Sequence, residues 1–203
     1  MGAVWCAPQN MGHWGASRNA PLCVSLLFPH EWWTKGGVEK AATGAPLWNY
    51  KIPNTGGGRS TPAVADGVVY FGSVESMLYA LDAQTGWNIW RFRLDKATIS
   101  TPCIAEEMIF TGAADGNIYC IDARNSKELW RFATDNQVTG SPIIHRDSLY
   151  CGSIDKSIYC LEYRSGRLRW KFDTGAAITG TPAAYDDLVY IGSLDHKLYA
   201  LTA

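Results

Sequence analysis

Apolar positions alternate with a period of two inside short segments, and these segments themselves recur every 40 residues. The stretch from Thr61 to Phe92 is repeated from Thr101, from Ser141 and, in part, from Thr181. Alternation with a period of two predicts strands rather than helices. Self-similarity at a fixed spacing predicts one supersecondary unit stacked on its own copies, because each unit buries the apolar face of its neighbour.

Each repeat is expected to contain four antiparallel strands, which in the first copy cover residues 62–65, 68–72, 77–82 and 89–94. Asp66-Gly67 supplies a hairpin turn between the first two. In the fourth strand, Trp90 and Phe92 point one way and Arg91 the other. Four strands per repeat predict an all-β propeller of about four blades, with cations on the outer strand discouraging edge-to-edge pairing.

A recurring motif precedes each of these tryptophans. Residues 80–90, "ALDAQTGWNIW", resemble the tryptophan-docking motif of pyrroloquinoline-quinone (PQQ) type propellers, which reads roughly Ala-x-Asp-x-x-Thr-Gly-x-x-x-Trp. The second copy has Ser126 in place of the glycine, and the third has Glu162 in place of the aspartate. The resemblance covers about residues 47–203 and implies a structural docking role for Trp48, Trp90, Trp130 and Trp170. It specifies the fold and not the function, since many non-catalytic proteins carry these repeats.

Two regions are expected: a non-repeat N-terminal extension over residues 1–46, and a propeller over residues 47–203. The repeats lie near residues 61–100, 101–140, 141–180 and 181–203, and residues 47–52 form an additional outer strand. The extension contains one apolar run, residues 20–28, which is too short to span a bilayer. This run has few features of a secretion signal.

Ring closure is left open between two arrangements. Residues 47–52 have the outer-strand alternation, and the last repeat ends where an outer strand is due. We expect the N-terminal strand to complete the last blade and close a ring of four blades, which removes free sheet edges. The alternative is an open arc, which would pair into a homodimer.

The charge and the cysteines of the chain bear on its partners and on its cellular compartment. The net charge of the 203 residues is −1 and no basic cluster is present, which argues against a nucleic-acid partner. Four cysteines fall in strands and are expected to be buried thiols that act as small hydrophobes: Cys103, Cys120, Cys151 and Cys160. Such thiols fit a reducing compartment such as the cytoplasm. The resemblance instead points to the cell envelope or periplasm, so the localisation stays open.

No constellation of catalytic or metal-binding residues is found. The four histidines are scattered, and no Cys-x-x-Cys pair is present. Acidic residues recur at two positions of the repeat, where we expect them to accept backbone N–H bonds in turns: Asp82, Asp122 and Glu162, and Asp115, Asp155 and Asp195. The glycine-rich residues 54–60 lack the phosphate-loop pattern and are predicted to be a linker.

The resemblance implies two functions. PQQ-dependent dehydrogenases use an eight-bladed ring, a calcium ion, an Asp base and often an adjacent Cys-Cys pair; this chain has about half the repeats and no Cys-Cys. We therefore expect no enzyme, no PQQ and no metal. The repeats are similar to those of the outer-membrane assembly lipoprotein of the barrel-insertion machinery, which implies a scaffold for a protein partner.

The candidate interaction surface lies on the loops that lead into the inner strands, because loops on a rigid scaffold concentrate recognition. Its residues are Arg59, Lys96, Asp135, Asn136 and Gln137, and Ser60, Ser100, Thr139 and Thr179 are expected to rim the channel. The alternative function is a propeller that binds a quinone, sugar or ion in its channel, or a remnant of a PQQ-dependent dehydrogenase.

Overall fold

The computed structural model describes residues 35–39, 44–53 and 57–203, and this part of the chain contains strands and turns but no helix. The strands are β1 (Lys35–Glu39), β2 (Pro46–Lys51), β3 (Ala63–Ala65), β4 (Val68–Gly72), β5 (Met77–Asp82), β6 (Asn88–Arg93), β7 (Cys103–Ala105), β8 (Met108–Gly112), β9 (Asn117–Asp122), β10 (Glu128–Ala133), β11 (Ile143–His145), β12 (Ser148–Gly152), β13 (Ser157–Glu162), β14 (Leu168–Asp173), β15 (Ala183–Tyr185), β16 (Leu188–Ser193) and β17 (Lys197–Thr202). No helix in the described ranges is long and apolar enough to cross a membrane.

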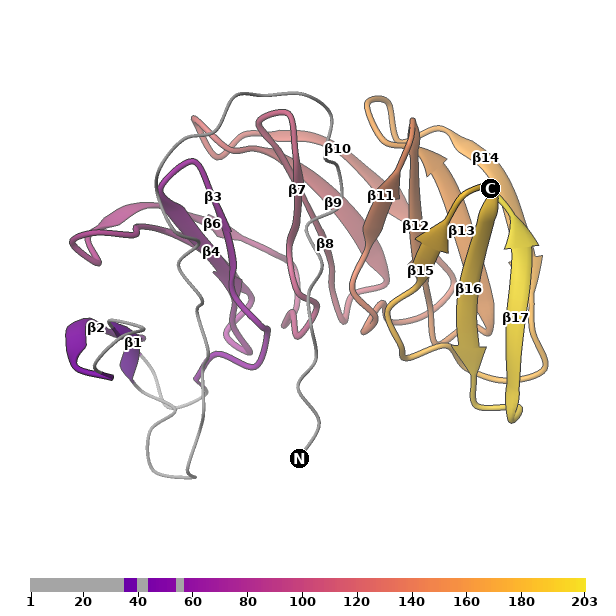
Figure 1. The fold of residues 1–203 in the computed structure, drawn as a ribbon, viewed down its shortest axis with the longest axis horizontal. Coiled ribbons are helices and arrows are strands. Elements are labelled where there is room, and N and C mark those ends of the chain that lie inside the picture. The colour runs from indigo at the N-terminus through magenta and orange to yellow at the C-terminus, as the bar shows by residue number, and fades with distance from the viewer. Residues whose placement is uncertain (1–34, 40–43, 54–56) are drawn as a thin grey trace.

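Four antiparallel sheets stand side by side along the chain (Figure 1). Blade 1 has the order β3-β4-β5-β6, blade 2 has β7 to β10, blade 3 has β11 to β14, and blade 4 has β15-β16-β17. Within every blade, consecutive strands are neighbours, as in a meander. The all-β propeller architecture expected from the repeat is therefore confirmed.

The outer two strands of blades 1 to 3 share one register. Ala80 pairs with Trp90, Cys120 with Trp130 and Cys160 with Trp170, and each sheet has a register shift next to this pair. A bulge of this kind increases the local twist of a strand. The same side of each outer strand therefore carries its tryptophan toward the following blade.

Closure of the ring by the N-terminal strand is wrong. Strand β2 pairs with β1, and Val38 opposite Trp48 reproduces the spacing of Ala80 opposite Trp90. The edge of β2 that would have met β17 is thus already hydrogen-bonded to β1. Among the described residues β17 pairs only with β16, and β2 and β17 lie at opposite ends of an open arc (Figure 1). The sequence had suggested that residues 47–52 form an outer strand with no strand before it. Strand β1 precedes it and pairs with it.

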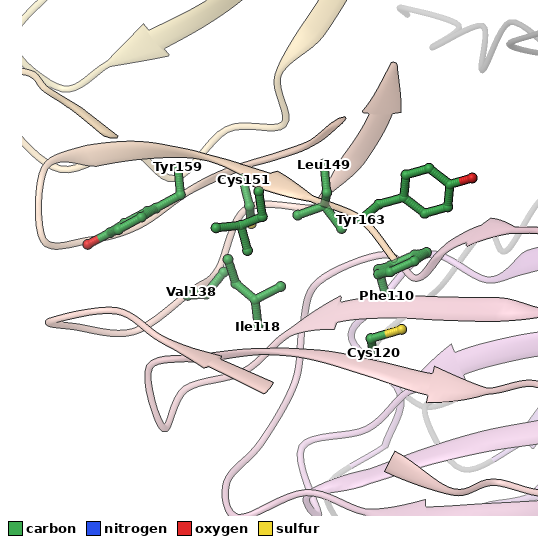
Figure 2. Close-up of a cluster of buried hydrophobic side chains, with 9 residues drawn as sticks. Phe110, Ile118, Cys120, Val138, Leu149, Cys151, Tyr159 and Tyr163 are labelled. Atoms are coloured by element: carbon green, nitrogen blue, oxygen red, sulfur yellow. The ribbon is translucent and has the colours of Figure 1, made fainter. Parts of the chain in front are cut away.

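The core consists of clusters between neighbouring blades. Phe110 and Ile118 of blade 2 pack against Leu149 and Cys151 of blade 3, and all four side chains are fully buried (Figure 2). Glycine is required at position 112, because a Cβ there would lie 2.2 Å from the side chain of Val138 on the connector between these blades. Burial of this interface stabilises the relative position of the two sheets.

Three of the strand cysteines, Cys120, Cys151 and Cys160, are free thiols inside this core. Cys120, Cys151 and Cys160 are buried, and Cys103 is half-buried. Burial raises the pKa of the Cys120 thiol to about 12, so the group stays protonated at neutral pH. These cysteines therefore pack as small hydrophobes, as expected.

Candidate functional site

Tryptophan side chains join each blade to the next. The indole Nε1 of Trp48 donates to the Ala83 carbonyl at 3.0 Å, that of Trp90 to Ala123 at 2.7 Å and that of Trp130 to Tyr163 at 3.0 Å. Trp170 contacts the Tyr150 ring at 5.8 Å between centroids, and its indole has no acceptor among the described residues. Trp48 thus docks on blade 1 in the way that Trp90 docks on blade 2.

The turn that receives the indole has a backbone conformation that favours glycine. Gly166 has φ +71°, and a Cβ on it would lie 2.7 Å from the Trp130 ring. Gly86 has φ +72° and approaches Trp48 in the same way. Ser126, in blade 2, adopts φ 56° without being glycine. The departure of Ser126 from the motif therefore leaves the turn conformation intact.

The recurring acids of the turns between second and third strands are hydrogen-bond acceptors. The Asp155 carboxylate accepts from the Tyr159 hydroxyl at 2.6 Å, from the Ser157 amide at 2.9 Å and from the Asp135 amide at 3.0 Å. Asp195 repeats the pattern with Tyr199 at 2.6 Å and the Gly175 amide at 2.8 Å. Each carboxylate thus ties its own turn to the connector arriving from the preceding blade.

These contacts shift the ionisation of both partners. Burial opposes the charged form of Asp155, but the Tyr159 hydroxyl and the Asp135 and Ser157 amides outweigh burial and lower the pKa of its carboxyl. Burial, and then the hydrogen bond to Asp155, raises the pKa of Tyr159 to about 12. At neutral pH the pair is therefore one carboxylate and one phenol, a structural bond rather than a proton-transfer pair.

The other recurring acids, which precede the outer strands, also serve turns. Asp82 Oδ1 accepts from the Thr85 amide at 2.7 Å, and Asp122 Oδ1 accepts from the Arg124 amide at 2.8 Å. Glu162 instead accepts from the Ser165 hydroxyl at 2.7 Å. Both sets of recurring acids therefore accept hydrogen bonds from residues of the fold itself.

The predicted interaction residues are exposed on three successive connectors. Asp135, Asn136 and Gln137 follow one another after β10; Lys96 lies on the connector after β6 and Arg59 on the connector before β3. Lys171 of β14 lies 3.5 Å from Asp135 Oδ2. The structure thus joins three of the five residues in one stretch and places Lys96 and Arg59 on two other connectors of the same kind.

Hydroxyl groups fix the backbone of this stretch. Thr134 Oγ1 donates to the Asn136 carbonyl at 2.6 Å, and Ser153 Oγ donates to the Asn136 and Gln137 carbonyls at 3.2 Å each. The interaction residues are consequently displayed on a backbone held from both sides. Sequence reasoning missed these two hydroxyl residues, although Thr174 and Ser193 recur 40 residues later and could have indicated them.

The four residues that were expected to rim a channel carry only hydroxyl groups, without the carboxylate that a calcium and PQQ site needs. Ser60 Oγ accepts the Gly72 amide at 2.6 Å and Ser100 Oγ accepts the Gly112 amide at 3.2 Å, so both hydroxyls hold their own blade together. Thr139 Oγ1 is buried without a hydrogen-bond partner among the described residues, and Thr179 is exposed. In the same part of the chain, no three His, Cys, Asp or Glu side chains are grouped as in a metal site. The Asp, calcium and paired-cysteine arrangement that the resemblance implies therefore has no counterpart in these residues.

Comparison with known families matches nearly all of the described chain. A family model described as "Outer membrane protein assembly factor BamB" matches residues 36–137 and 114–203. Among curated proteins, a quinohemoprotein alcohol dehydrogenase from Comamonas testosteroni is 36% identical over 53 residues, which is 25% of this chain and 8% of that protein.

Solved structures share the fold. BamB from Moraxella catarrhalis superposes with a TM-score of 0.71 at 23% identity, over 78% of this chain and 50% of BamB. The computationally designed Ika8 protein gives a TM-score of 0.74 at 16% identity, over 84% of this chain and 53% of the design. The chain thus spans about half the length of these two structures and 8% of the length of the curated relative.

Proposed function

Because the chain belongs to the family of the outer membrane protein assembly factor BamB, we propose that it is a non-catalytic scaffold that binds a protein partner in cell-envelope assembly or sensing. The observation that carries this proposal is the connector after β10. Its side chains Asp135, Asn136 and Gln137 are exposed, while its backbone is held by Thr134 and Ser153. A surface that is already ordered before binding loses little conformational entropy on association.

Use of the recurring acids within the fold supports the same reading. Asp155 and Asp195 each accept three hydrogen bonds from their own turn and from the preceding connector. A carboxylate engaged in this way is a poor general base. The exposed connector residues, which differ from one copy of the repeat to the next, are the side chains left available for recognition.

The connector after β14 supplies replacement residues with which this surface can be tested. Residues Gly175, Ala176 and Ala177 take the places of Asp135, Asn136 and Gln137, and Thr174 Oγ1 donates to the Ala176 carbonyl at 2.7 Å as Thr134 does to Asn136. The triple variant Asp135→Gly, Asn136→Ala, Gln137→Ala should therefore fold normally.

Affinity capture from the source cell, followed by mass spectrometry, should recover a protein that the triple variant fails to retain. Gln84→Ala, in a turn at the opposite end of the strands, is the control and should retain it. Equal retention by the triple variant and the control would refute the connector surface. Fractionation of the source cell tests the proposed envelope location separately.

A small-ligand binder is the second candidate, favoured by the 36% identity to a stretch of a quinohemoprotein alcohol dehydrogenase. Thermal unfolding with PQQ and calcium distinguishes it from a scaffold. A scaffold should show an unchanged Tm at every PQQ concentration. A saturable rise in Tm would favour the second candidate, because a ligand that binds only the folded state stabilises it.

A further inference from the structure

The face of blade 4 that is turned away from blade 3 is apolar and uncovered (Figure 1). On this face, Leu198 of β17 is 73% exposed. The residues at its place in blades 1 to 3 are fully buried: Leu78, Ile118 and Ile158. Ala200 is also exposed, although its counterparts in β5, β9 and β13 are buried. In those blades the outer strand and the following blade cover these positions, and among the described residues blade 4 has neither.

Strand β17 has the sequence of a strand that pairs with an outer strand. Residues 198–201 read LYAL and are identical to residues 78–81 of β5. Strand β5 pairs along this edge with β6, where Trp90 lies opposite Ala80 and a second ring follows two residues later. In β17 the same edge is not paired with any described strand. A strand that fits this edge should therefore carry an indole opposite Ala200 and a second ring two residues away.

Strand β2 carries such a pair of rings. They belong to Trp48 and Tyr50, and the Trp48 indole docks on blade 1. The present neighbour of β2 matches it poorly, because β1 has Gly36 opposite Tyr50, where the other blades have leucine or isoleucine opposite a ring. Glycine inside a strand weakens the strand, since it has no side chain to pack.

We propose that two copies of this chain exchange strands, so that β17 of each copy displaces β1 and pairs with β2 of the other. Ala200 then lies opposite Trp48 of the partner subunit, and Leu198 lies opposite Tyr50 of the partner subunit. Each junction repeats the one between blades 1 and 2, where an outer strand pairs within one blade and docks its tryptophan on the next. Because the contact is head-to-tail, two junctions close a ring of two copies. This inference does not depend on the proposed scaffold function.

The inner strands at the two ends of the arc fit the same junction. Val64 of β3 is 39% exposed, whereas its counterparts Ile104 and Ile144 pack half-buried against the preceding blade. Tyr185 of β15 is 70% exposed and lies on the same face of blade 4 as Leu198. The chain spans 50% of BamB and 53% of Ika8, so two copies supply the length of one such structure. The chain thus carries both halves of the junction, which favours a second copy as the occupant.

Sedimentation velocity of the full 203-residue chain over a range of concentrations tests the assembly. The mass should reach twice 22.3 kDa and rise no further, because a closed ring leaves no free end. Leu198→Arg should raise the Kd of the dimer at least about tenfold, since it buries an unpaired charge in the junction. Leu129→Arg is the matched control, because Leu129 is 49% exposed on β10, outside the junction. This control should change the Kd by less than about twofold.

Disulfide trapping tests the register of the exchanged strands. In blade 1, Met77 pairs with Arg93, and the residues at these places in the junction are Lys197 and Lys51. Directly opposed Cα atoms of antiparallel strands lie about 4.5–5.5 Å apart, which is within the range that a disulfide spans. The double variant Lys51→Cys, Lys197→Cys should form a covalent dimer on mild oxidation. Each single variant should stay monomeric in a non-reducing gel.

Several results would overturn the proposal. They are a monomer at every concentration, a mass beyond two copies, equal weakening by Leu198→Arg and Leu129→Arg, and a crosslink within one chain. A dimer that the double variant fails to trap would also overturn it, because the contact would then lie elsewhere. A monomer that binds a peptide of residues 86–95 would instead assign the edge of β17 to an extended segment of another protein.

Discussion

Truncation of one docking tryptophan measures how strongly neighbouring blades are joined. Trp130 is half-buried, contacts the Phe110 ring at 5.8 Å between centroids and donates to the Tyr163 carbonyl at 3.0 Å. Loss of a large core aromatic costs about 3–5 kcal/mol, and partial exposure places Trp130 near the lower end. The lost hydrogen bond adds about 1 kcal/mol. Trp130→Ala is therefore expected to lower the free energy of unfolding by about 4 kcal/mol.

Two further variants separate the contributions. Trp130→Phe keeps a ring but no donor and should cost about 1–2 kcal/mol. Arg131→Ala removes two exposed ion pairs, to Asp95 and Glu128, on the opposite side of the same strand and should cost under about 1 kcal/mol. Urea unfolding followed by far-UV circular dichroism gives all three values. Equal costs for Trp130→Ala and Arg131→Ala would show that the tryptophan does not join blades 2 and 3.

Three other changes test the turns and the core. Gly166→Ala should destabilise the protein more than Gly67→Ala in thermal unfolding, because both have positive φ but only at Gly166 would a Cβ meet an indole, at 2.7 Å. Folding lowers the carboxyl pKa of Asp155, so the stabilisation that this carboxylate provides is present above about pH 3.9 and is lost as the pH falls through the folded pKa. Asp155→Asn should therefore make the free energy of urea unfolding less sensitive to acid. An unchanged pH profile would contradict this expectation. Burial raises the pKa of Cys151, so iodoacetamide should modify it only in urea, as read by peptide mass spectrometry; rapid modification of the native protein would show that the interface opens.

The strands were predictable because the pattern of each strand recurs along the sequence with a spacing of 40 residues. Expected residues 68–72 and 77–82 coincide with β4 and β5, and 89–94 differs from β6 by one residue. Strand β1 escaped prediction because its sequence, KGGVE, has two glycines and one apolar side chain and so shows no alternation. Thr43-Gly44 was the available signal, since it repeats the Thr85-Gly86 of the docking motif.

Ring closure and the connector geometry depended on contacts between residues that lie far apart in the sequence. The edge of β2 is occupied by β1, which alone decides against pairing with β17 of the same chain. The connector after β10 was recognisable as a loop, but its rigidity comes from Ser153, which is 17 residues from Asn136 along the chain. The N-terminal extension was predicted over residues 1–46; its residues 1–34 and 40–43 lie outside the described residues, and there it stays a prediction.

In a repeat protein, a position at which one copy differs from the others indicates a role that the shared fold does not require. At positions where the copies agree, the structure supplies a reason within the fold: tryptophan bonds to the next blade, and aspartate ties a turn to a connector. Trp87 has no such reason, since its counterparts are Lys127 and Arg167 and its ring is 78% exposed. Stability alone would permit a charged residue there, because the two neighbouring blades fold with one. The indole of Trp87 is therefore a departure from the repeat that packing among the described residues does not require.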